Sequence, residues 1–289
     1  MTCGTIKIGD FEVSRLGFGA MRVVGDGVFG PPPDMSAARE TLRLVPELGV
    51  NLIDTANAYG PLISELLVRD VLHPYRGLLI ATKGGFLRPG PFQWQSDGRP
   101  EALRAAVKGS LLTLGVDCID LWQLHRIDPA VPADEQFGAI AELQREGLIR
   151  HVGLCNVWSE QVEAARKHFT VAAVQNLYHV IDRRSEPVVE YCEQNGIPFI
   201  AFFPLATGAL AAHDSILQRV AARIGATPAQ AALAWLLKRS PSIAVIPGTQ
   251  NPAHLRENVG AASIDLSDEH YAEIERIGRK AGQLRAQAK

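Results

Sequence analysis

The sequence is short of several features that would restrict its function. It has 289 residues and no apolar run near the roughly 18 residues of a membrane-spanning helix. Its four cysteines, Cys3, Cys118, Cys155 and Cys192, form no C-x2-C pair of a zinc or redox site. We therefore expect free thiols in a reducing compartment. The first residues lack the basic and apolar regions of a signal peptide, and we expect a cytoplasmic protein.

A charge excess of one sign is also missing. The chain has 29 lysines and arginines against 31 aspartates and glutamates, with no dense basic stripe. This balance argues against a nucleic-acid partner. By length the chain could form one large domain or two average ones. No linker or break in composition interrupts it, so we predict one domain over residues 1–289.

Eight short apolar runs recur along the chain, with amphipathic stretches between them. Runs of this length predict buried strands, and helical spacing between them predicts crossover helices. We expect helices over residues 100–114 and 228–237, and another that begins at a Ser36 cap. The eight predicted strands span residues 16–19, 51–54, 78–82, 119–124, 151–154, 171–175, 198–202 and 243–246.

Eight such units favour a closed (β/α)8 TIM barrel over an open doubly wound sheet, which has fewer strands and a switch point. Two segments fall outside the repeat. The turn at Gly9 and Asp10 predicts an N-terminal β-hairpin that could plug the barrel. Residues 267–280, with Tyr271, Ile274 and Ile277 on one face, predict an extra C-terminal helix.

Polar side chains follow most of the predicted strands. In a (β/α)8 barrel the carboxyl ends of the strands meet at the active site. Taken singly, each such residue is most simply a helix cap, a structural histidine or a lysine that reaches solvent. As a set, Asp54, Lys83 and His125 on consecutive strands would converge in one mouth. Buried charge of that kind must be paired.

Several strings in the sequence resemble the signature of the aldo-keto reductases. The resemblance covers nearly the whole chain, in the family's order. The strings are NLIDTANAYG at 51–60, LISE at 62–65, ATK at 81–83, IDLWQLH at 119–125, GLCN at 153–156, VQN at 174–176, FPL at 203–205, IPGT at 246–249 and EN at 257–258.

This resemblance implies a catalytic tetrad of Asp54, Tyr59, Lys83 and His125. Hydride transfer to a carbonyl leaves an alkoxide that must take a proton, and a tyrosine with a pKa near its ordinary value of about 10 can supply it. The Lys83 ammonium would lower that pKa, while Asp54 pairs with Lys83. His125 would orient the substrate oxygen by a hydrogen bond.

The resemblance also implies NADPH as the cofactor, since no side chain can supply a hydride. Asn156 and Gln175 would bind the nicotinamide carboxamide, and Phe202 would stack on its ring. The remaining cofactor residues lie around the barrel mouth and in the segment that binds the adenosine and its 2′-phosphate. They are Gly19, Ala20, Met21, Asp54, Cys155, Phe203, Leu205, Gly248, Thr249, His254, Glu257 and Asn258.

The sequence departs from the family pattern around the cofactor. Cys155 stands in place of a serine, and Phe202 in place of a tyrosine. Gly248 replaces a basic residue, and His254 replaces the arginine that clamps the 2′-phosphate. With these changes the case against NADH as the cofactor is only moderate, but we still expect NADPH.

Four residues are candidates for the substrate pocket. Met21 replaces a bulky aromatic residue, while Phe86 and Trp94 could form an apolar wall. Arg126 stands where many family members have tryptophan. It either pairs with Asp128 at the surface or attracts an anionic group of the substrate.

Two alternatives remain open at this point. A cofactor-binding subunit of the same family could act slowly as a redox sensor or as a partner of another protein. A metal-dependent hydrolase on the same barrel is disfavoured, since only His125 lies at a strand end and no His-x-His pair occurs. We therefore expect no metal, a small carbonyl substrate and a monomer, although the sequence does not identify the substrate, the direction of reaction or the oligomeric state.

Overall fold

A computed structural model describes residues 3–206 and 215–287 and contains an eight-stranded parallel sheet. Each strand overlaps one of the eight predicted runs, which confirms the (β/α)8 barrel. In sheet order, the strands are β3 (Phe18–Gly19), β4 (Leu52–Asp54), β5 (Leu79–Gly84), β8 (Ile119–Leu124), β9 (Ile149–Cys155), β10 (Val171–Leu177), β11 (Phe199–Phe202) and β12 (Ile243–Val245).

The first and last strands of the sheet meet and close the barrel. Leu16 forms a parallel bridge with Val245. The Gly17 amide donates to the Val245 carbonyl at 2.8 Å, and the Val245 amide donates to the Arg15 carbonyl at 2.8 Å. The closure leaves no open sheet edge, and it brings the ends of β3 and β12 side by side at the mouth.

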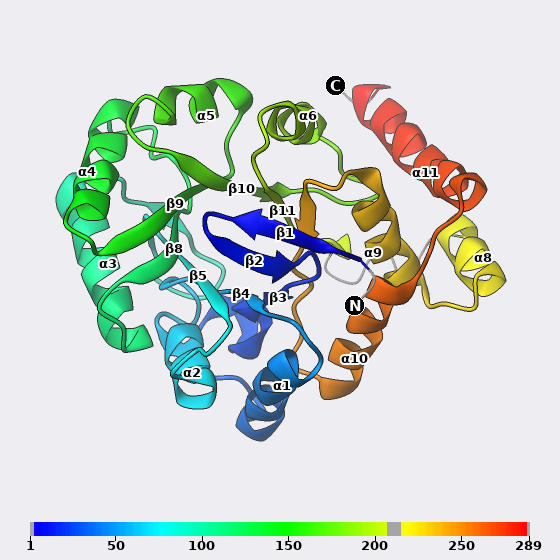
Figure 1. Cartoon of the computed structure of the whole chain (residues 1–289), viewed down its shortest axis with the longest axis horizontal. Helices are drawn as coiled ribbons and strands as arrows, with labels where there is room; N and C mark the ends of the chain where they lie inside the picture. The colour runs from blue at the N-terminus through cyan, green and yellow to red at the C-terminus, as the bar shows by residue number, and fades with distance from the viewer. Residues whose placement is uncertain (1–2, 207–214, 288–289) are drawn as a thin grey trace.

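Helices surround the strands on all sides (Figure 1). The expected helix over 100–114 is confirmed, as is the one that begins at Pro228 after its Thr227 cap. The described helices include α1 (Met35–Glu47), α2 (Ile63–Leu72), α3 (Pro100–Leu114), α4 (Ala133–Arg145), α5 (Ser159–Ala165), α6 (Glu186–Gln194), α8 (Ser215–Arg223), α9 (Pro228–Arg239), α10 (Pro252–Gly260) and α11 (Asp268–Gln287).

The Ser36 cap predicted for the first of these helices is wrong. Helix α1 begins at Met35, and the Asp34 carboxylate accepts from the Ala37 amide at 2.9 Å. The cap therefore lies two residues earlier than expected, and Ser36 lies inside the first turn.

The N-terminal hairpin covers one end of the barrel. Strands β1 (Thr5–Ile8) and β2 (Phe11–Ser14) pair antiparallel and lie across the centre of the strand ring in Figure 1. Ile8 and Val13 are buried in a cluster with the barrel-interior residues Leu52, Leu79 and Leu121. The hairpin therefore plugs the amino-terminal end of the barrel, as expected, and leaves the other end for the site.

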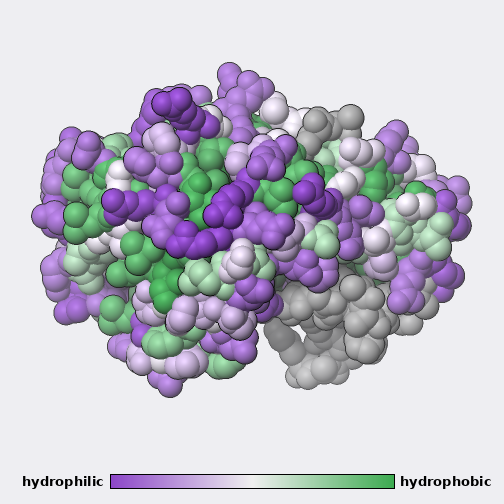
Figure 2. All heavy atoms as spheres, turned by 90° about the horizontal axis from the view of Figure 1, so that it is seen from below, coloured by the Kyte–Doolittle hydropathy of each residue, from purple (hydrophilic) through white to green (hydrophobic). Residues whose placement is uncertain are grey.

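The C-terminal helix α11 packs on α8 and α9 and extends further than the predicted 267–280. Ile274 is fully buried, and the Tyr271 ring stacks on Trp235 with 6.0 Å between centroids. Hydrophilic and hydrophobic residues are interspersed over the face of the molecule shown in Figure 2. Within the described ranges, no helix has both the length and the apolar character needed to cross a membrane.

Candidate active site

A cavity of about 1010 Å³ opens at the carboxyl ends of the strands. It is lined by residues of β3, β4, β9, β10 and β11, by residues that directly follow β8 and β12, and by other nearby segments. Of the predicted site residues, all but Ala20 and Lys83 line it: Gly19, Met21, Asp54, Tyr59, Phe86, Trp94, His125, Arg126, Cys155, Asn156, Gln175, Phe202, Phe203, Leu205, Gly248, Thr249, His254, Glu257 and Asn258.

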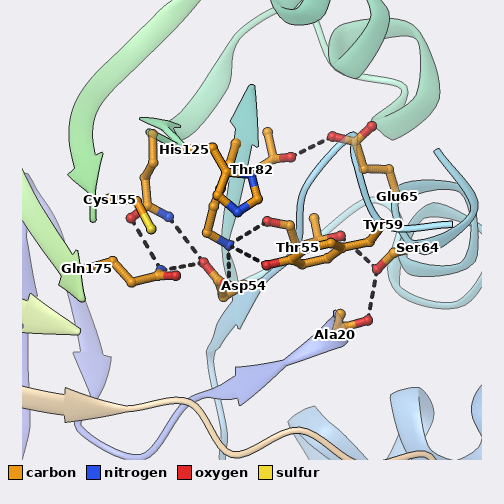
Figure 3. Close-up of polar contacts among 12 residues, drawn as sticks. Ala20, Asp54, Thr55, Tyr59, Ser64, Glu65, Thr82, His125, Cys155 and Gln175 are labelled. Carbon is orange, nitrogen blue, oxygen red and sulfur yellow. Dashed lines mark hydrogen bonds and ion pairs between the residues drawn. The ribbon is translucent and has the colours of Figure 1, made fainter. Parts of the chain in front are cut away.

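Lys83 and Asp54 form a buried ion pair. Figure 3 shows Asp54 with Gln175 on one side and Thr55 and Tyr59 on the other. The two residues lie on neighbouring strands, β5 and β4, and the Lys83 Nζ–Asp54 Oδ2 distance is 2.5 Å. The ammonium also donates to the Thr55 carbonyl at 2.9 Å. The pair raises the pKa of Lys83 even though burial alone would lower it. Lys83 is therefore a fixed positive charge in contact with Asp54 and Tyr59, which line the cavity.

Tyr59 lies in the loop between β4 and α2, with its hydroxyl 3.4 Å from Lys83 Nζ. The expected lowering of its pKa by Lys83 is confirmed, although it is not the largest effect. Lys83 does lower the pKa of Tyr59, but burial is the larger effect and raises it to about 12. The phenol therefore stays protonated at neutral pH and has one ammonium ready to stabilise its anion.

His125 follows β8, and its side chain is buried beside Tyr59, with the ring centroids 5.9 Å apart. Burial, followed by the charges of Lys83, Arg126 and Arg88, holds its pKa well below the ordinary value. The imidazole is therefore neutral at pH 7. Nδ1 is buried with no hydrogen-bond partner among the described residues, and the residue lines the cavity.

The sequence analysis missed Gln123, which completes the environment of Asp54. Gln123 Nε2 donates to Asp54 Oδ1 at 3.1 Å, and Gln175 Nε2 donates to the same oxygen at 2.7 Å. Strand alternation was the signal available, because Gln123 lies two residues before His125 on the same face of β8. Gln175, which was expected to bind the cofactor, thus also donates a hydrogen bond to Asp54.

Asn156 adopts a left-handed backbone conformation, with φ of 57°, directly after β9. Its Nδ2 donates to the His125 carbonyl at 3.1 Å and to Cys155 Sγ at 3.2 Å. Burial raises the pKa of the Cys155 thiol to about 12, so it is a neutral partner. These bonds fix the Asn156 amide between β8 and β9, where it faces the cavity beside Gln175 and the half-buried Phe202.

The far end of the cavity lies where β3 meets β12. A side chain at Gly248 would place its Cβ 2.4 Å from the Gly19 carbonyl oxygen, so the close approach of the two strands requires glycine there. Thr249 Oγ1 accepts from the Asn251 amide at 3.0 Å, and Glu257 accepts from Thr227 at 2.7 Å. The missing basic residue at 248 therefore has a packing cause.

Ala20 is placed differently from the other predicted cofactor residues. Its side chain is fully buried, and its carbonyl accepts from the Ser64 hydroxyl at 3.1 Å. The cavity lining also contains residues that the sequence analysis did not single out as site residues, namely Arg22, Val28, Pro204, Ala229, Ile246, Pro247 and Gln250.

Phe86 and Trp94 form an aromatic wall beside the tetrad, and this name is kept for the two residues below. Their ring centroids are 5.5 Å apart, and Phe86 lies 4.7 Å from His125. The loop that holds Trp94 is a small hairpin of β6 (Phe86–Leu87) and β7 (Gln95–Ser96). The wall lies next to the Tyr59 phenol, at 6.4 Å between the Trp94 and Tyr59 rings.

Arg126 lines the same part of the cavity, with its guanidinium carbon 5.7 Å from the centre of the Phe86 ring. Over residues 3–206 and 215–287 no ion pair joins it to Asp128, whose carboxylate instead accepts from the Gly98 and Ala130 amides. Of the two alternatives for Arg126, the geometry favours the one in which it faces the substrate. The part of the chain that the structure describes holds no cluster of three histidine, cysteine or acidic side chains suited to a metal ion.

Comparison with known proteins places this geometry in a family. The model of the aldo/keto reductase family matches residues 15–279. The chain belongs to this family. The resemblance inferred from the motifs is therefore confirmed, together with the class of enzyme, an oxidoreductase.

Three relatives represent the similarity. The chain is 51% identical over 276 residues to an uncharacterised oxidoreductase of Schizosaccharomyces pombe, which covers 96% of this chain and 90% of that protein. It is 42% identical over 287 residues to the pyridoxine 4-dehydrogenase of Escherichia coli, which covers 97% of this chain and all of that protein (100%). The solved aldo-keto reductase from Klebsiella pneumoniae in complex with NADPH shares 27% identity and a TM-score of 0.78, with 96% of each chain covered.

Proposed function

We propose that this aldo/keto reductase catalyses the reversible, NADPH-dependent reduction of an aldehyde or ketone to an alcohol, with Tyr59 as the proton donor. One observation carries the proposal. The buried Lys83 ammonium lies within hydrogen-bonding distance of both the Asp54 carboxylate and the Tyr59 phenol at the wall of the cavity. This arrangement suits the transfer of a proton to a substrate oxygen that has become negatively charged.

The residues of the chain fit the cofactor. A cavity of about 1010 Å³ is at the upper end of the roughly 300–1,000 Å³ of small-molecule sites, which leaves room for a dinucleotide and a small substrate. Asn156 and Gln175 supply amides at the tetrad end, and Thr249 with the start of α10 lies at the other end. NADPH, when bound, supplies the hydride.

The side chains divide the remaining work. The Tyr59 hydroxyl gives its proton to the alkoxide oxygen that hydride transfer leaves on the substrate, so the product is the neutral alcohol. Lys83 stabilises the resulting phenolate, and Asp54 holds Lys83 in place. The neutral His125 binds the carbonyl oxygen and aligns it with the phenol.

An aromatic aldehyde is the substrate that the pocket favours. The aromatic wall offers edges and faces to a flat ring, and Arg126 lies beside it. The relative named pyridoxine 4-dehydrogenase, at 42% identity, makes pyridoxal a specific candidate, because it is a flat aromatic aldehyde.

We further propose that the protein is a cytoplasmic monomer. All four cysteines are free, as expected in a reducing compartment. Size-exclusion chromatography with light scattering gives the mass in solution; a dimer would contradict the second part of this proposal.

The first prediction tests the role of Tyr59. Tyr59→Phe keeps the ring and removes the proton, so NADPH oxidation with 4-nitrobenzaldehyde or pyridoxal should fall by about 10²-fold or more. Cofactor affinity, measured by fluorescence titration with NADPH, should stay within about twofold, because the lost hydroxyl is the proton donor rather than a cofactor ligand.

Tyr191→Phe is the matched control, because Tyr191 is a tyrosine on the outer surface that bonds to Arg166 and Glu163. It should turn over at the wild-type rate. Retained turnover in Tyr59→Phe would refute the assigned proton donor. A wild-type enzyme that binds NADPH but stops after one turnover would favour the redox-sensor alternative.

A further inference from the structure

Arg88 makes an unusual set of contacts for a partly exposed arginine. Its guanidinium donates only to backbone carbonyls, and none of the ion pairs among residues 3–206 and 215–287 includes it. Nε donates to Gln93 at 2.8 Å, Nη1 donates to Val28 and Ala58 at 2.9 Å each, and Nη2 donates to Gly27 at 2.7 Å. The planar fork of arginine can serve four acceptors at fixed angles, which lysine cannot.

These four carbonyls belong to three separate segments. Gln93 lies in the β6–β7 hairpin, Gly27 and Val28 in the short helix η2 (Asp26–Val28), and Ala58 in the loop that holds Tyr59. The two loops are also joined to each other by the Gly60 amide, which donates to the Val28 carbonyl at 3.2 Å, and the hairpin is joined to η2 by the Phe92 amide, which donates to the Gly27 carbonyl at 3.1 Å. Arg88 therefore ties the hairpin to the two loops beneath it.

Trp94 depends on this connection for its position. The Arg88 guanidinium carbon lies 3.7 Å from the centre of the Trp94 ring, which is a close cation–π contact. Trp94 is 39% exposed, and its other aromatic contacts are edge-on, to Phe86, Tyr59 and His125. Because Trp94 is exposed and lies on a turn rich in glycine and proline, the contact with Arg88 is the face-on contact that holds its ring over the cavity.

We propose that Arg88 is a positioning residue that holds Trp94 in place as one side of the substrate pocket and thereby sets the preference for aromatic over aliphatic aldehydes. This inference rests on the proposed carbonyl reduction. Arg88 itself does not line the cavity, so it acts through Trp94 rather than on the substrate.

The proton donor should be affected much less. Tyr59 keeps its bond to Lys83, its amide donates to the Ala56 carbonyl at 3.1 Å, and its carbonyl accepts from the Ser64 amide at 3.1 Å. Losing the single bond from Arg88 to the Ala58 carbonyl leaves these contacts intact. A small aliphatic aldehyde, which reaches Tyr59 without touching Trp94, therefore reports on the chemistry alone.

The experiment compares 4-nitrobenzaldehyde with propanal in Arg88→Met, Trp94→Ala and the double variant. Arg88→Met should lower the ratio of kcat/KM for the aromatic substrate to that for propanal by about tenfold, mainly through KM. Trp94→Ala should lower the ratio by a similar amount. In the double variant the loss should match that of Trp94→Ala alone, because Arg88 has no further effect once its target is absent.

Two more variants complete the set. Arg88→Lys keeps the charge but loses the planar guanidinium, so its ratio of kcat/KM values should lie between those of wild type and Arg88→Met. If Arg88→Met does not fold, the ratio in Arg88→Lys tests the proposal instead. Arg39→Met removes an arginine paired with Asp70 on the outer surface and should leave the ratio unchanged. Equal losses on both aldehydes, or losses that add in the double variant, would overturn the proposal.

Fluorescence separates this inference from the proposed function. In a Trp158→Phe background, Trp94 is the exposed indole, since Trp122 and Trp235 are fully buried. Arg88→Met should make its emission easier to quench with acrylamide, and unchanged quenching would overturn the proposal. If the wild-type protein reduces neither aldehyde, the proposed function fails, while the quenching result still tests the role of Arg88.

Discussion

The Asp54 carboxylate receives three hydrogen-bond donors inside the barrel, from Lys83, Gln123 and Gln175. A carboxylate and an ammonium removed from water cost several kcal/mol each unless they are paired and fully bonded. The side-chain amides of Gln123 and Gln175 therefore supply the hydrogen bonds that water would give to an exposed carboxylate. Because Asp54 is fully hydrogen-bonded in this way, it can pair with Lys83, and Lys83 can be buried without losing its charge.

At the residue scale, the sequence could predict the tetrad but not its surroundings. Asp54, Lys83 and His125 each end a recognisable apolar strand, so their convergence followed from the barrel alone. Strand alternation places Gln123 on the same face of the barrel as His125 but does not give its bond to Asp54, and Arg88 lies in an irregular loop with no periodic signal. The net rise in the pKa of Tyr59 also depends on burial, which a linear pattern does not give.

Arg126 leads to the second residue-scale prediction. Because its guanidinium lines the cavity beside Phe86, it should favour substrates with a negative charge on the ring. Arg126→Ala should lower kcat/KM for 4-carboxybenzaldehyde by about tenfold and change it for neutral 4-nitrobenzaldehyde by less than about threefold. Steady-state kinetics on the two aldehydes measure this difference.

A matched control is Arg104→Ala, which removes an arginine paired with Glu146 on the outer surface. It should leave both substrates unaffected. If kcat/KM falls equally for both aldehydes in Arg126→Ala, Arg126 shapes the pocket but does not bind the charged group of the substrate.

At the scale of elements, Glu65 joins a strand to two helices. It lies on α2 with no exposed surface, and it accepts from Thr82 on β5 at 2.5 Å and from Thr113 on α3 at 2.7 Å. Thr82 immediately precedes Lys83, so this contact holds the strand that positions the catalytic ammonium. Burial raises the pKa of Glu65 despite these hydroxyl donors.

The raised pKa of Glu65 makes the folded protein less stable as the pH rises. Above pH 4.5 the unfolded chain loses the Glu65 proton before the folded chain does, so this group lowers the free energy of unfolding as pH rises through its folded pKa. Glu65→Gln cannot titrate. As pH rises from 4.5 toward 8, the free energy of unfolding of wild type should therefore fall relative to that of the variant.

Urea unfolding at several pH values measures this difference. Glu135→Gln, an exposed glutamate on α4, is the control and should show no such trend. A difference that grows in the opposite direction with pH would mean that the hydroxyl donors, rather than burial, decide the protonation of Glu65.

At the scale of the whole molecule, the eight apolar runs predicted the barrel, and two segments outside them predicted the hairpin plug and the extra helix. Sequence periodicity could not show how the barrel closes. The junction of β3 and β12 depends on Arg15, which donates to the carbonyls of Leu237, Ser240 and Ile243. Contacts between residues more than 200 positions apart follow from the fold and leave no local pattern.

The hairpin plug allows stability to be separated from catalysis. Ile8 has no exposed surface and packs against the lower interior of the barrel, at the end opposite the cavity. Ile8→Ala should lower the free energy of unfolding by about 2–5 kcal/mol, through lost burial and the space left behind. The value of kcat with 4-nitrobenzaldehyde should be unchanged, since the tetrad is held by β4, β5 and β8 rather than by the hairpin.

Lys7→Ala on the same strand is the control, because Lys7 is exposed and should change stability by less than about 0.5 kcal/mol. Unfolding in urea, followed by circular dichroism and by tryptophan fluorescence, should give one coincident transition for both variants if residues 1–289 form one domain, as we propose. Two separated transitions would contradict the single domain. A kcat that falls with stability in Ile8→Ala would show that the plug and the active site are not independent. The barrel would then transmit strain from one end to the other, through the interior cluster that joins Ile8 to Ile200 and Phe202.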